Sequence, residues 1–202
     1  MTRFSFVGSV VMFGEVAEWT KAPHSKCGVR ETVPRVRIPP SPPRTAMRDP
    51  LLETSGKVIA FYEREYYCFS NFSSFAVEWR GRLWQTSEHA YQAAKFLESK
   101  PELAEEITTA RSAHDAFKIA QAHADEVPKA FHETKVALME DLCRHKLEQH
   151  PYIQKKLRET EEKQIVEDSP KDAFWGWGPN RDGRNELGKV WMRLREALPP
   201  KA

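Results

Sequence analysis

Three prolines divide the middle of the chain into segments that read as helices. Pro101, Pro128 and Pro151 each open a segment with helical apolar spacing. The first turn of a helix accepts proline, because the amide that proline lacks would have no partner there. The longest of these segments follows Pro128, and its apolar residues recur at intervals of three and four, which predicts a buried stripe. That stripe consists of Val136, Met139, Cys143 and Leu147.

The rest of the chain adds short strands to this helical middle. β-Branched and aromatic residues predict a strand at 57–62, and Ile165-Val166 predicts another. Residues 76–84 predict a hairpin that turns at Arg80-Gly81. Thr86 or Ser87 can cap a helix that runs to about Leu97. Further helices are expected at about 101–110, 112–123, 128–149, 151–161 and 186–198. The fold class is therefore α+β, a mostly helical single domain with a small antiparallel sheet.

Residues 1–46 are predicted to lie outside this domain. Residues 31–46 are rich in proline and show no apolar period, so we expect an extended or disordered leader. The strings EVAEW at 15–19 and VRIP at 36–39 are also what results when the arms of a transfer-RNA gene are translated. We therefore expect that the start site is placed too far upstream and that the domain begins at Met47. The alternative is a basic, proline-rich tail that binds a partner.

Charge and cysteine content narrow the classes of function. Of 31 Lys/Arg and 29 Asp/Glu, residues 1–46 hold seven and three, so the remainder has a formal charge of −2. A near-neutral body is a poor general nucleic-acid binder and favours a small-molecule substrate or a single nucleotide. No apolar run is long enough to span a bilayer. The three cysteines are widely spaced and form no readable disulfide framework or zinc site. We expect a reduced, cytoplasmic protein without a metal.

The segment WQTSEHAYQAAKF, at 84–96, is the first candidate for chemistry. Positions 88, 92 and 95 lie at i, i+4 and i+7, so Glu88, Gln92 and Lys95 share one helical face. Spacing alone favours a bland interpretation, in which Glu88 suits the helix dipole and the face is solvated.

The second candidate is DAFWGWGPNRDGRNELG, at 172–188. Its four glycines can let backbone amides approach a ligand, and Arg181 and Arg184 add positive charge before a helix begins, which suits a phosphate. Trp175 and Trp177 offer faces on which a base can stack. The alternative is a glycine-rich turn whose aromatic residues are buried in the core.

These strings, in this order, resemble the motifs of the YbiA-like, or NADAR, family of N-glycosidases. The family pattern is close to F-S-N-F, W-P-T-S-E-H-x-x-Q-A-x-K-F, D-x-x-W-G and G-x-N-x-L-G, and the chain matches it at 69–72, 84–96, 172–176 and 183–188. The chain departs from it at Gln85, where proline is usual. Phe131 lies near a position where some relatives carry a functional tryptophan, and we assign it no role.

The resemblance implies a set of site residues. Glu88 corresponds to the essential glutamate of the family, and Asp172 to its later aspartate. Lys95 is a third catalytic candidate, as a proton donor or as an amine that forms a Schiff base with the opened sugar. A carboxylate suits the reaction, because cleavage of the bond between base and sugar builds positive charge on the sugar. The residues implied to bind substrate are Asn71, Gln92, Trp175, Gly176, Arg184 and Asn185.

The resemblance also implies a range of substrates. It points to hydrolysis of the base–ribose bond in a phosphorylated ribosyl compound, with the ribosylamino-pyrimidinone phosphates of the early riboflavin pathway first. The alternatives are ADP-ribosyl-guanine, including ADP-ribosylated guanine in nucleic acid, and a module that binds ADP-ribose or another nucleotide without cleaving it. No cofactor, metal or membrane is implied, and the oligomeric state stays open.

Overall fold

The structure is a computed structural model that describes residues 57–62 and 65–199. The leader predicted at 1–46 and the proposed start at Met47 lie outside these residues. The described elements, in chain order, are β1 (Val58–Phe61), a 3₁₀ turn (Tyr67–Phe69), β2 (Val77–Trp79), β3 (Arg82–Trp84), α1 (Ser87–Ala94), α2 (Pro101–Thr108), α3 (Ala113–Ala122), a second 3₁₀ turn (Ala124–Glu126), α4 (Lys129–Gln149), α5 (Pro151–Glu159), β4 (Gln164–Glu167) and α6 (Glu186–Glu196).

The predicted helices are confirmed, with one end misplaced. Helix α1 stops at Ala94 rather than near Leu97. The amides of Lys95 and Phe96 bond carbonyls three residues back, at Gln92 and Ala93, so the helix tightens and ends. The tightened turn sets the position of Lys95 beside the site described below.

The strands form two separate pairs. The predicted hairpin is confirmed, since β2 and β3 pair antiparallel and turn at Arg80 and Gly81, both with positive φ. Strand β1 pairs in parallel with β4, with Val58 opposite Gln164 and Phe61 opposite Glu167. The sequence did not predict this pairing, because the two strands are far apart in the chain and no local signal links them. The α+β class is confirmed.

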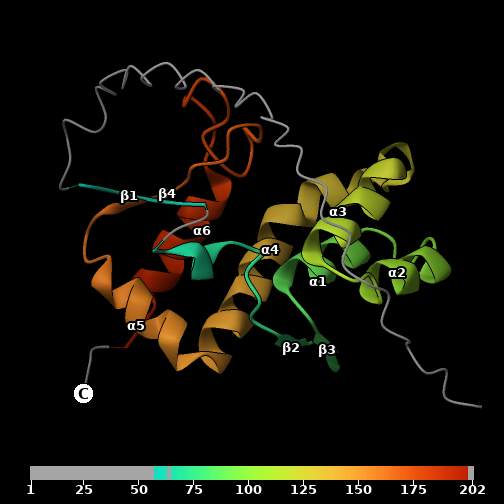
Figure 1. The fold of residues 1–202 in the computed structure, drawn as a ribbon, viewed down its shortest axis with the longest axis horizontal. Coiled ribbons are helices and arrows are strands. Elements are labelled where there is room, and N and C mark those ends of the chain that lie inside the picture. Colours follow the sequence, from blue (N-terminus) through green and yellow to red (C-terminus); the bar gives the residue numbers. More distant parts are fainter. Residues whose placement is uncertain (1–56, 63–64, 200–202) are drawn as a thin grey trace, which may run out of the picture. The chain divides into compact units, whose positions relative to one another are not determined.

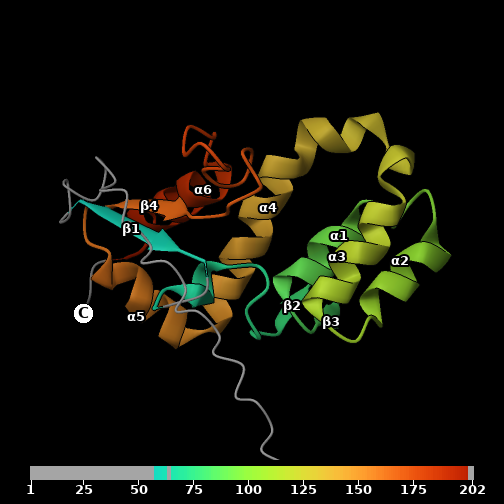
Figure 2. The same cartoon turned by 45° about the horizontal axis from the view of Figure 1, so that its top comes forward.

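Helix α4 runs through the middle of the described domain. Figures 1 and 2 show α1, α2 and α3 on one side of it, with α5, α6 and the β1–β4 pair on the other. Helix α4 contacts α1, α5, α6 and β2. The predicted stripe on this helix faces the core: Met139, Cys143 and Leu147 are buried, and Val136 packs against them half-buried. The first turns of α4 stand beside α1, which is where the pocket lies.

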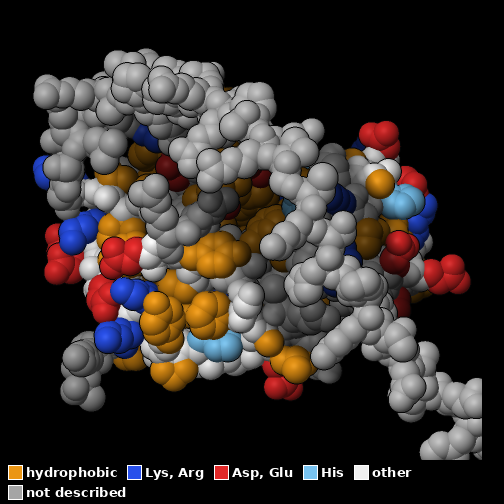
Figure 3. Space-filling model, in the orientation of Figure 1, with side chains coloured by type: hydrophobic (Ala, Val, Ile, Leu, Met, Phe, Trp, Pro, Cys, Tyr) orange, Lys and Arg blue, Asp and Glu red, His pale blue; other side chains and the backbone are white. Residues whose placement is uncertain are grey.

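The surface of the described residues carries charges of both signs. Figure 3 shows Lys and Arg side chains mixed with Asp and Glu side chains on the face it draws, rather than gathered by sign. Many of them are paired, for example Arg82 with Glu105 at 2.7 Å and Arg193 with Glu140 at 2.6 Å. Among the described residues, no helix has the length and apolar character needed to cross a membrane.

Candidate active site

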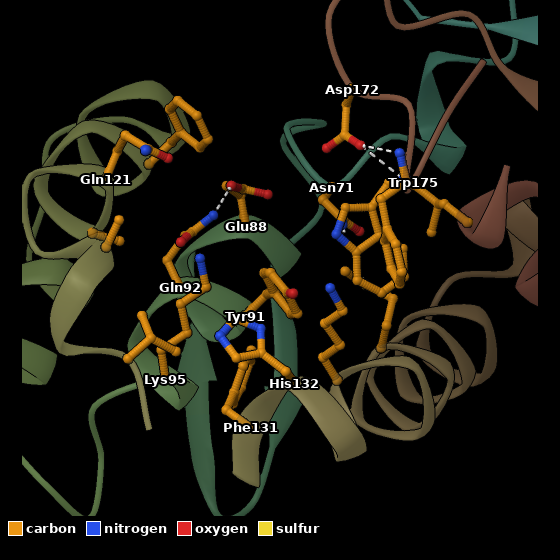
Figure 4. Close-up of a pocket in the computed structure, with 18 of the residues that line it drawn as sticks. Asn71, Glu88, Tyr91, Gln92, Lys95, Gln121, Phe131, His132, Asp172 and Trp175 are labelled. Carbon is orange, nitrogen blue, oxygen red and sulfur yellow. Dashed lines mark hydrogen bonds between the residues drawn. The ribbon is translucent and has the colours of Figure 1, made fainter. Parts of the chain in front are cut away.

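A cavity of about 320 Å³ opens between α1, the first turns of α4, and the loops that carry residues 71–72 and 172–175. Its lining includes six of the nine predicted site residues. Figure 4 shows them converging on one space from separate elements, with Glu88 and Gln92 on α1 and Asp172 and Trp175 on the loop across from them. These six residues are Asn71, Glu88, Gln92, Lys95, Asp172 and Trp175.

Glu88 is almost fully enclosed at the cavity wall, with 4% of its surface exposed. Its Oε1 accepts a hydrogen bond of 2.6 Å from Nε2 of Gln92, one turn later. Burial raises the pKa of Glu88 to about 7, although the Gln92 hydrogen bond and the charge of Lys95 act in the opposite direction. The bland interpretation of Glu88 as a solvated first-turn acid is therefore wrong, because its carboxylate faces a cavity and not bulk water.

The start of α1 is fixed on both sides of Glu88. The Thr86 side chain caps the helix by accepting from the His89 amide, as predicted for this position. The buried His89 ring bridges Thr86 Oγ1 at 2.9 Å and the Ala110 carbonyl at 3.1 Å. The Glu88 amide donates to the Asn71 carbonyl at 3.0 Å, which ties α1 to the F-S-N-F loop. The helix start is therefore held by the cap and by these hydrogen bonds, with Gln85 at the position where proline is usual.

A buried lysine holds the loop that presents Asn71. Lys146, on α4, is wholly enclosed, and its Nζ donates to the Ser70 carbonyl at 2.9 Å and to Ser73 Oγ at 2.8 Å. Trp191, on α6, donates its indole N–H to the Phe69 carbonyl at 2.9 Å. The loop is thus anchored from two helices, and the Asn71 amide is held between Met139 and the cavity.

Side chains with nitrogen donors line the cavity near α4. His132 and Lys135 stand one turn apart on α4, and Lys95 projects from the end of α1. Figure 4 shows Lys95 next to Gln92 and His132 beside Phe131, with Asp172 across the cavity from them. Burial lowers the pKa of Lys95, and the nearby Lys135 lowers it further. His132 and Lys135 were not predicted, although their spacing on a helix that borders the site is a usable signal.

Asp172 shapes the loop that carries Trp175. Its Oδ1 accepts hydrogen bonds of 2.8 Å from the amides of Phe174 and Trp175. The Trp175 ring packs edge-on against Tyr91, with 5.6 Å between the ring centroids. Asp172 itself is exposed at the mouth of the cavity. One oxygen of the Asp172 carboxylate therefore holds the loop through hydrogen bonds, and the residue also lines the cavity.

Three predicted substrate-binding residues do not line the cavity. Arg184 pairs with Glu186 at 3.3 Å and lies over the Phe174 ring. Asn185 donates to the Ile165 carbonyl and accepts from the Glu167 amide. A Cβ on Gly176 would come within 2.5 Å of the Glu167 carbonyl. Gly176 and Asn185 thus allow loop and strand backbones to approach each other, whereas Asp172 and Trp175 of the same motif line the cavity.

Glu167 is the principal residue that sequence reasoning missed. It ends β4, lines the cavity, and has an Oε2 atom enclosed without a hydrogen-bond partner among the described residues. Burial raises the pKa of Glu167 to about 8, with Asp172 and Glu88 adding to the shift. A carboxylate at the end of a short apolar strand, just before a loop, is the signal that could have found it.

Replacing Trp175 with Ala tests whether its ring binds substrate. If a base stacks on it, substrate affinity should fall by about 1–3 kcal/mol. The side chain is only half-buried, so the loss of stability should be modest. Trp177→Ala is the matched control, because Trp177 is buried and does not line the cavity. Titration and melting of both variants give the answer. Unchanged affinity in Trp175→Ala, with a large drop in melting temperature, would remove Trp175 from the site.

Known proteins share this fold and these motifs. The NADAR domain model matches residues 60–199. The chain is 36% identical to N-glycosidase YbiA of Escherichia coli over 143 residues, which covers 70% of this chain and 88% of that one. It is 34% identical to an N-glycosidase of Nostoc punctiforme, covering 69% and 92%. The solved structure of E. coli YbiA superposes with a TM-score of 0.63 at 35% identity, covering 70% of this chain and 84% of that one.

Fold, site and relatives together define the class of the protein, a hydrolase that acts on N-glycosyl bonds. More specifically, the chain belongs to the NADAR domain family.

Proposed function

We propose that the protein hydrolyses the base–ribose bond of a phosphorylated ribosyl compound with a single-ring base, and that ribosylamino-pyrimidinone phosphates of the early riboflavin pathway are its substrates. The observation that carries the proposal is the buried Glu88 carboxylate in a cavity that Lys95, His132 and Lys135 also line.

Glu88 suits the bond-breaking step. Departure of the base leaves positive charge on the sugar, and a carboxylate in a site of low dielectric stabilises that charge strongly. The same carboxylate can take a proton from the attacking water. With a pKa of about 7, Glu88 is ionised for this work only above neutral pH.

The far end of the cavity suits a phosphate. Lys95, His132 and Lys135 offer nitrogen donors from two helices, and Asp172 lies across from Lys95 and His132. A ribose phosphate laid between the two ends would direct its phosphate toward α4 and its base toward the carboxylates. This arrangement favours phosphorylated substrates over free ribosides.

The size and polarity of the cavity favour one ring. About 320 Å³ is near the lower limit for small-molecule pockets, which suits a mononucleotide better than ADP-ribosyl-guanine. Oδ1 of Asn71 and Oε1 of Gln92 are enclosed without a partner among the described residues, and both residues line the cavity. Such oxygens accept from donors, and an amino-pyrimidinone or a ribose hydroxyl supplies them.

Two relatives support the pathway. The chain is 34% identical to a riboflavin biosynthesis protein of Vibrio vulnificus, of which it covers 38%, and 30% identical to a chloroplastic riboflavin biosynthesis protein of Zea mays, of which it covers 25%. The cytoplasmic location stays a prediction.

The test is release of ribose phosphate from a panel of purified compounds. We expect cleavage of ribosylamino-pyrimidinone phosphates, and slower cleavage of the same compounds without phosphate. Lys135→Met should remove most of this preference for phosphate, because it keeps the side-chain length and deletes the charge. Exclusive cleavage of ADP-ribosyl-guanine would replace the substrate assignment. Tight binding of ADP-ribose with no cleavage of any compound would instead indicate a binding module.

A further inference from the structure

We infer that Glu167 is a catalytic residue of this site, the acid that donates a proton to the departing base. The inference rests on the proposed function. It assigns a role that neither Asp172 nor Lys95 fills as well, because Asp172 is exposed and hydrogen-bonded within its own loop, and Lys95 interacts chiefly with Glu88, the base of the same reaction.

The backbone of Glu167 is held from several directions. Its amide donates to Asn185 Oδ1 at 3.0 Å, and its carbonyl accepts from the Trp177 amide at 3.0 Å. Gly176 lies so close to the same carbonyl that a Cβ there would collide with it. On the other side, Glu167 is paired with Phe61 of β1. Gly176 and Asn185 thus fix one carboxylate at the cavity, although they do not line the cavity themselves.

The side chain, by contrast, is unengaged at its tip. Oε2 of Glu167 is enclosed and has no hydrogen-bond partner among the described residues, and Glu167 is one of the residues that line the cavity. A buried polar atom without a partner is costly, and a fold retains one where a ligand completes it. The charged groups around it are Glu88 on α1 and Asp172 on the loop, both acidic. Burial disfavours a negative charge on Glu167, and the two neighbouring acids add to the effect, so Glu167 keeps its proton at neutral pH.

In the proposed reaction Glu88 accepts one proton and Glu167 donates another. Water attacks the anomeric carbon as the bond from that carbon to the base nitrogen breaks. Ionised Glu88 takes a proton from the water, and protonated Glu167 gives its proton to the nitrogen, whose bonding pair leaves with the base. The products are the free base and ribose phosphate. Exchange with solvent returns Glu88 to the ionised form and Glu167 to the protonated form, so nothing is oxidised or reduced.

The pH dependence follows from these two states. Activity should rise as Glu88 ionises near pH 7 and fall as Glu167 loses its proton near pH 8, which gives a bell-shaped profile with a narrow maximum. The basic groups that also line the cavity are Lys95, His132 and Lys135. Removing Glu167 should therefore abolish one limb specifically, and not merely lower the whole profile.

The experiment measures kcat against pH for the full chain and for Glu167→Gln with a ribosylamino-pyrimidinone phosphate. We expect a loss on the order of 100-fold in kcat, a small change in substrate affinity, and no alkaline limb. Glu167→Asp should keep the limb at reduced kcat. Asp168→Asn is the matched control, because Asp168 is the next carboxylate along the chain and does not line the cavity. It should keep both the rate and the limb.

Melting curves accompany each variant. Because Oε2 of Glu167 has no partner to lose, Glu167→Gln should fold as well as the parent. If it does not fold, the Glu167→Asp profile decides in its place, and loss of its alkaline limb would overturn the inference. If the parent cleaves the substrate and folded Glu167→Gln shows the same rate and the same pH profile, the role of Glu167 is overturned while the proposed function stands. Absence of cleavage by the parent would overturn the proposed function, and this inference with it.

Discussion

Replacing Glu88 with Gln is expected to lower kcat by on the order of 100-fold or more while making the protein more stable at pH 8. The amide keeps the shape of the side chain, and its oxygen can still accept from Gln92. What is lost is the charge that supports the transition state and takes a proton from water, so the rate falls much more than ground-state binding.

The gain in stability comes from the cost of a buried charge. The pKa of Glu88 rises from 4.5 in the unfolded chain to about 7 in the folded one. The folded state therefore binds more protons in this window, and stability falls as pH rises through it. Gln does not titrate and avoids this cost. The gain should be absent below about pH 4.5 and reach about 1–3 kcal/mol above pH 7.

Single-turnover rates, isothermal titration with substrate, and denaturant unfolding at pH 4 and pH 8 measure these quantities on one protein. Glu102→Gln is the matched control, since Glu102 is also an acid in a first helical turn but is exposed on α2. It should leave the rate unchanged and slightly lower the stability, because it loses only a favourable interaction with the helix dipole. Near-normal turnover in folded Glu88→Gln would end the catalytic assignment of Glu88.

Replacing Gly188 with Ala should cost about 2–3 kcal/mol of stability and reduce activity. Gly188 lies within α6, where Ala is normally preferred to Gly by about 1 kcal/mol. A Cβ there would nevertheless lie 2.2 Å from the Ile165 carbonyl and 2.5 Å from both terminal atoms of the Asn185 side chain. Either α6 moves away from β4 or Asn185 releases the Glu167 amide, and both disturb the site.

Gly81→Ala separates this collision from backbone strain. Gly81 has a φ of +74° at the hairpin turn, with open space where a Cβ would be. Ala there should cost about 1–2 kcal/mol through strain alone and leave kcat unchanged. Denaturant unfolding and kcat for both variants give the comparison. A Gly188→Ala protein as stable as the parent would show that α6 and β4 are less tightly joined than the structure indicates.

The sequence was sufficient for the parts of the fold that depend on local signals. Helix starts at Pro101 and Pro151, the cap at Thr86 and the turn at Arg80-Gly81 are each set by residues within a few positions. The pairing of β1 with β4 could not be predicted in this way, because it depends on contacts across most of the domain. The sequence shows Glu167 as a carboxylate at the end of a short apolar strand, but its place at the cavity depends on that distant pairing and on the Asn185 contact.

The resemblance picked out residues of both candidate segments, but it did not show which of them contact the cavity and which contact the rest of the fold. Glu88, Gln92 and Lys95 lie on one face of α1 as their spacing predicts, and the structure adds the cavity beside them. For the glycine-rich motif the same reasoning predicted ligand contact, whereas Gly176 and Asn185 contact the backbone of β4. Glycine is used both where a ligand approaches the backbone and where another strand does, and the sequence alone does not distinguish the two cases.

The parallel pairing of β1 with β4 also limits how early the domain can fold during its synthesis on the ribosome. Strand β1 emerges early, but its partner is made only after all of α1 to α5, and Asn185 and Gly188 follow later still. Until then the apolar residues Ile59 and Phe61 have no strand to cover them. Pairing between strands that are far apart in the sequence is slow, and the unpaired edge of β1 can meanwhile pair with other chains. A nascent chain that already contains Glu88 therefore lacks Glu167 and Asp172, and the cavity that these residues line is complete only after the chain has reached Leu187 in the last helix.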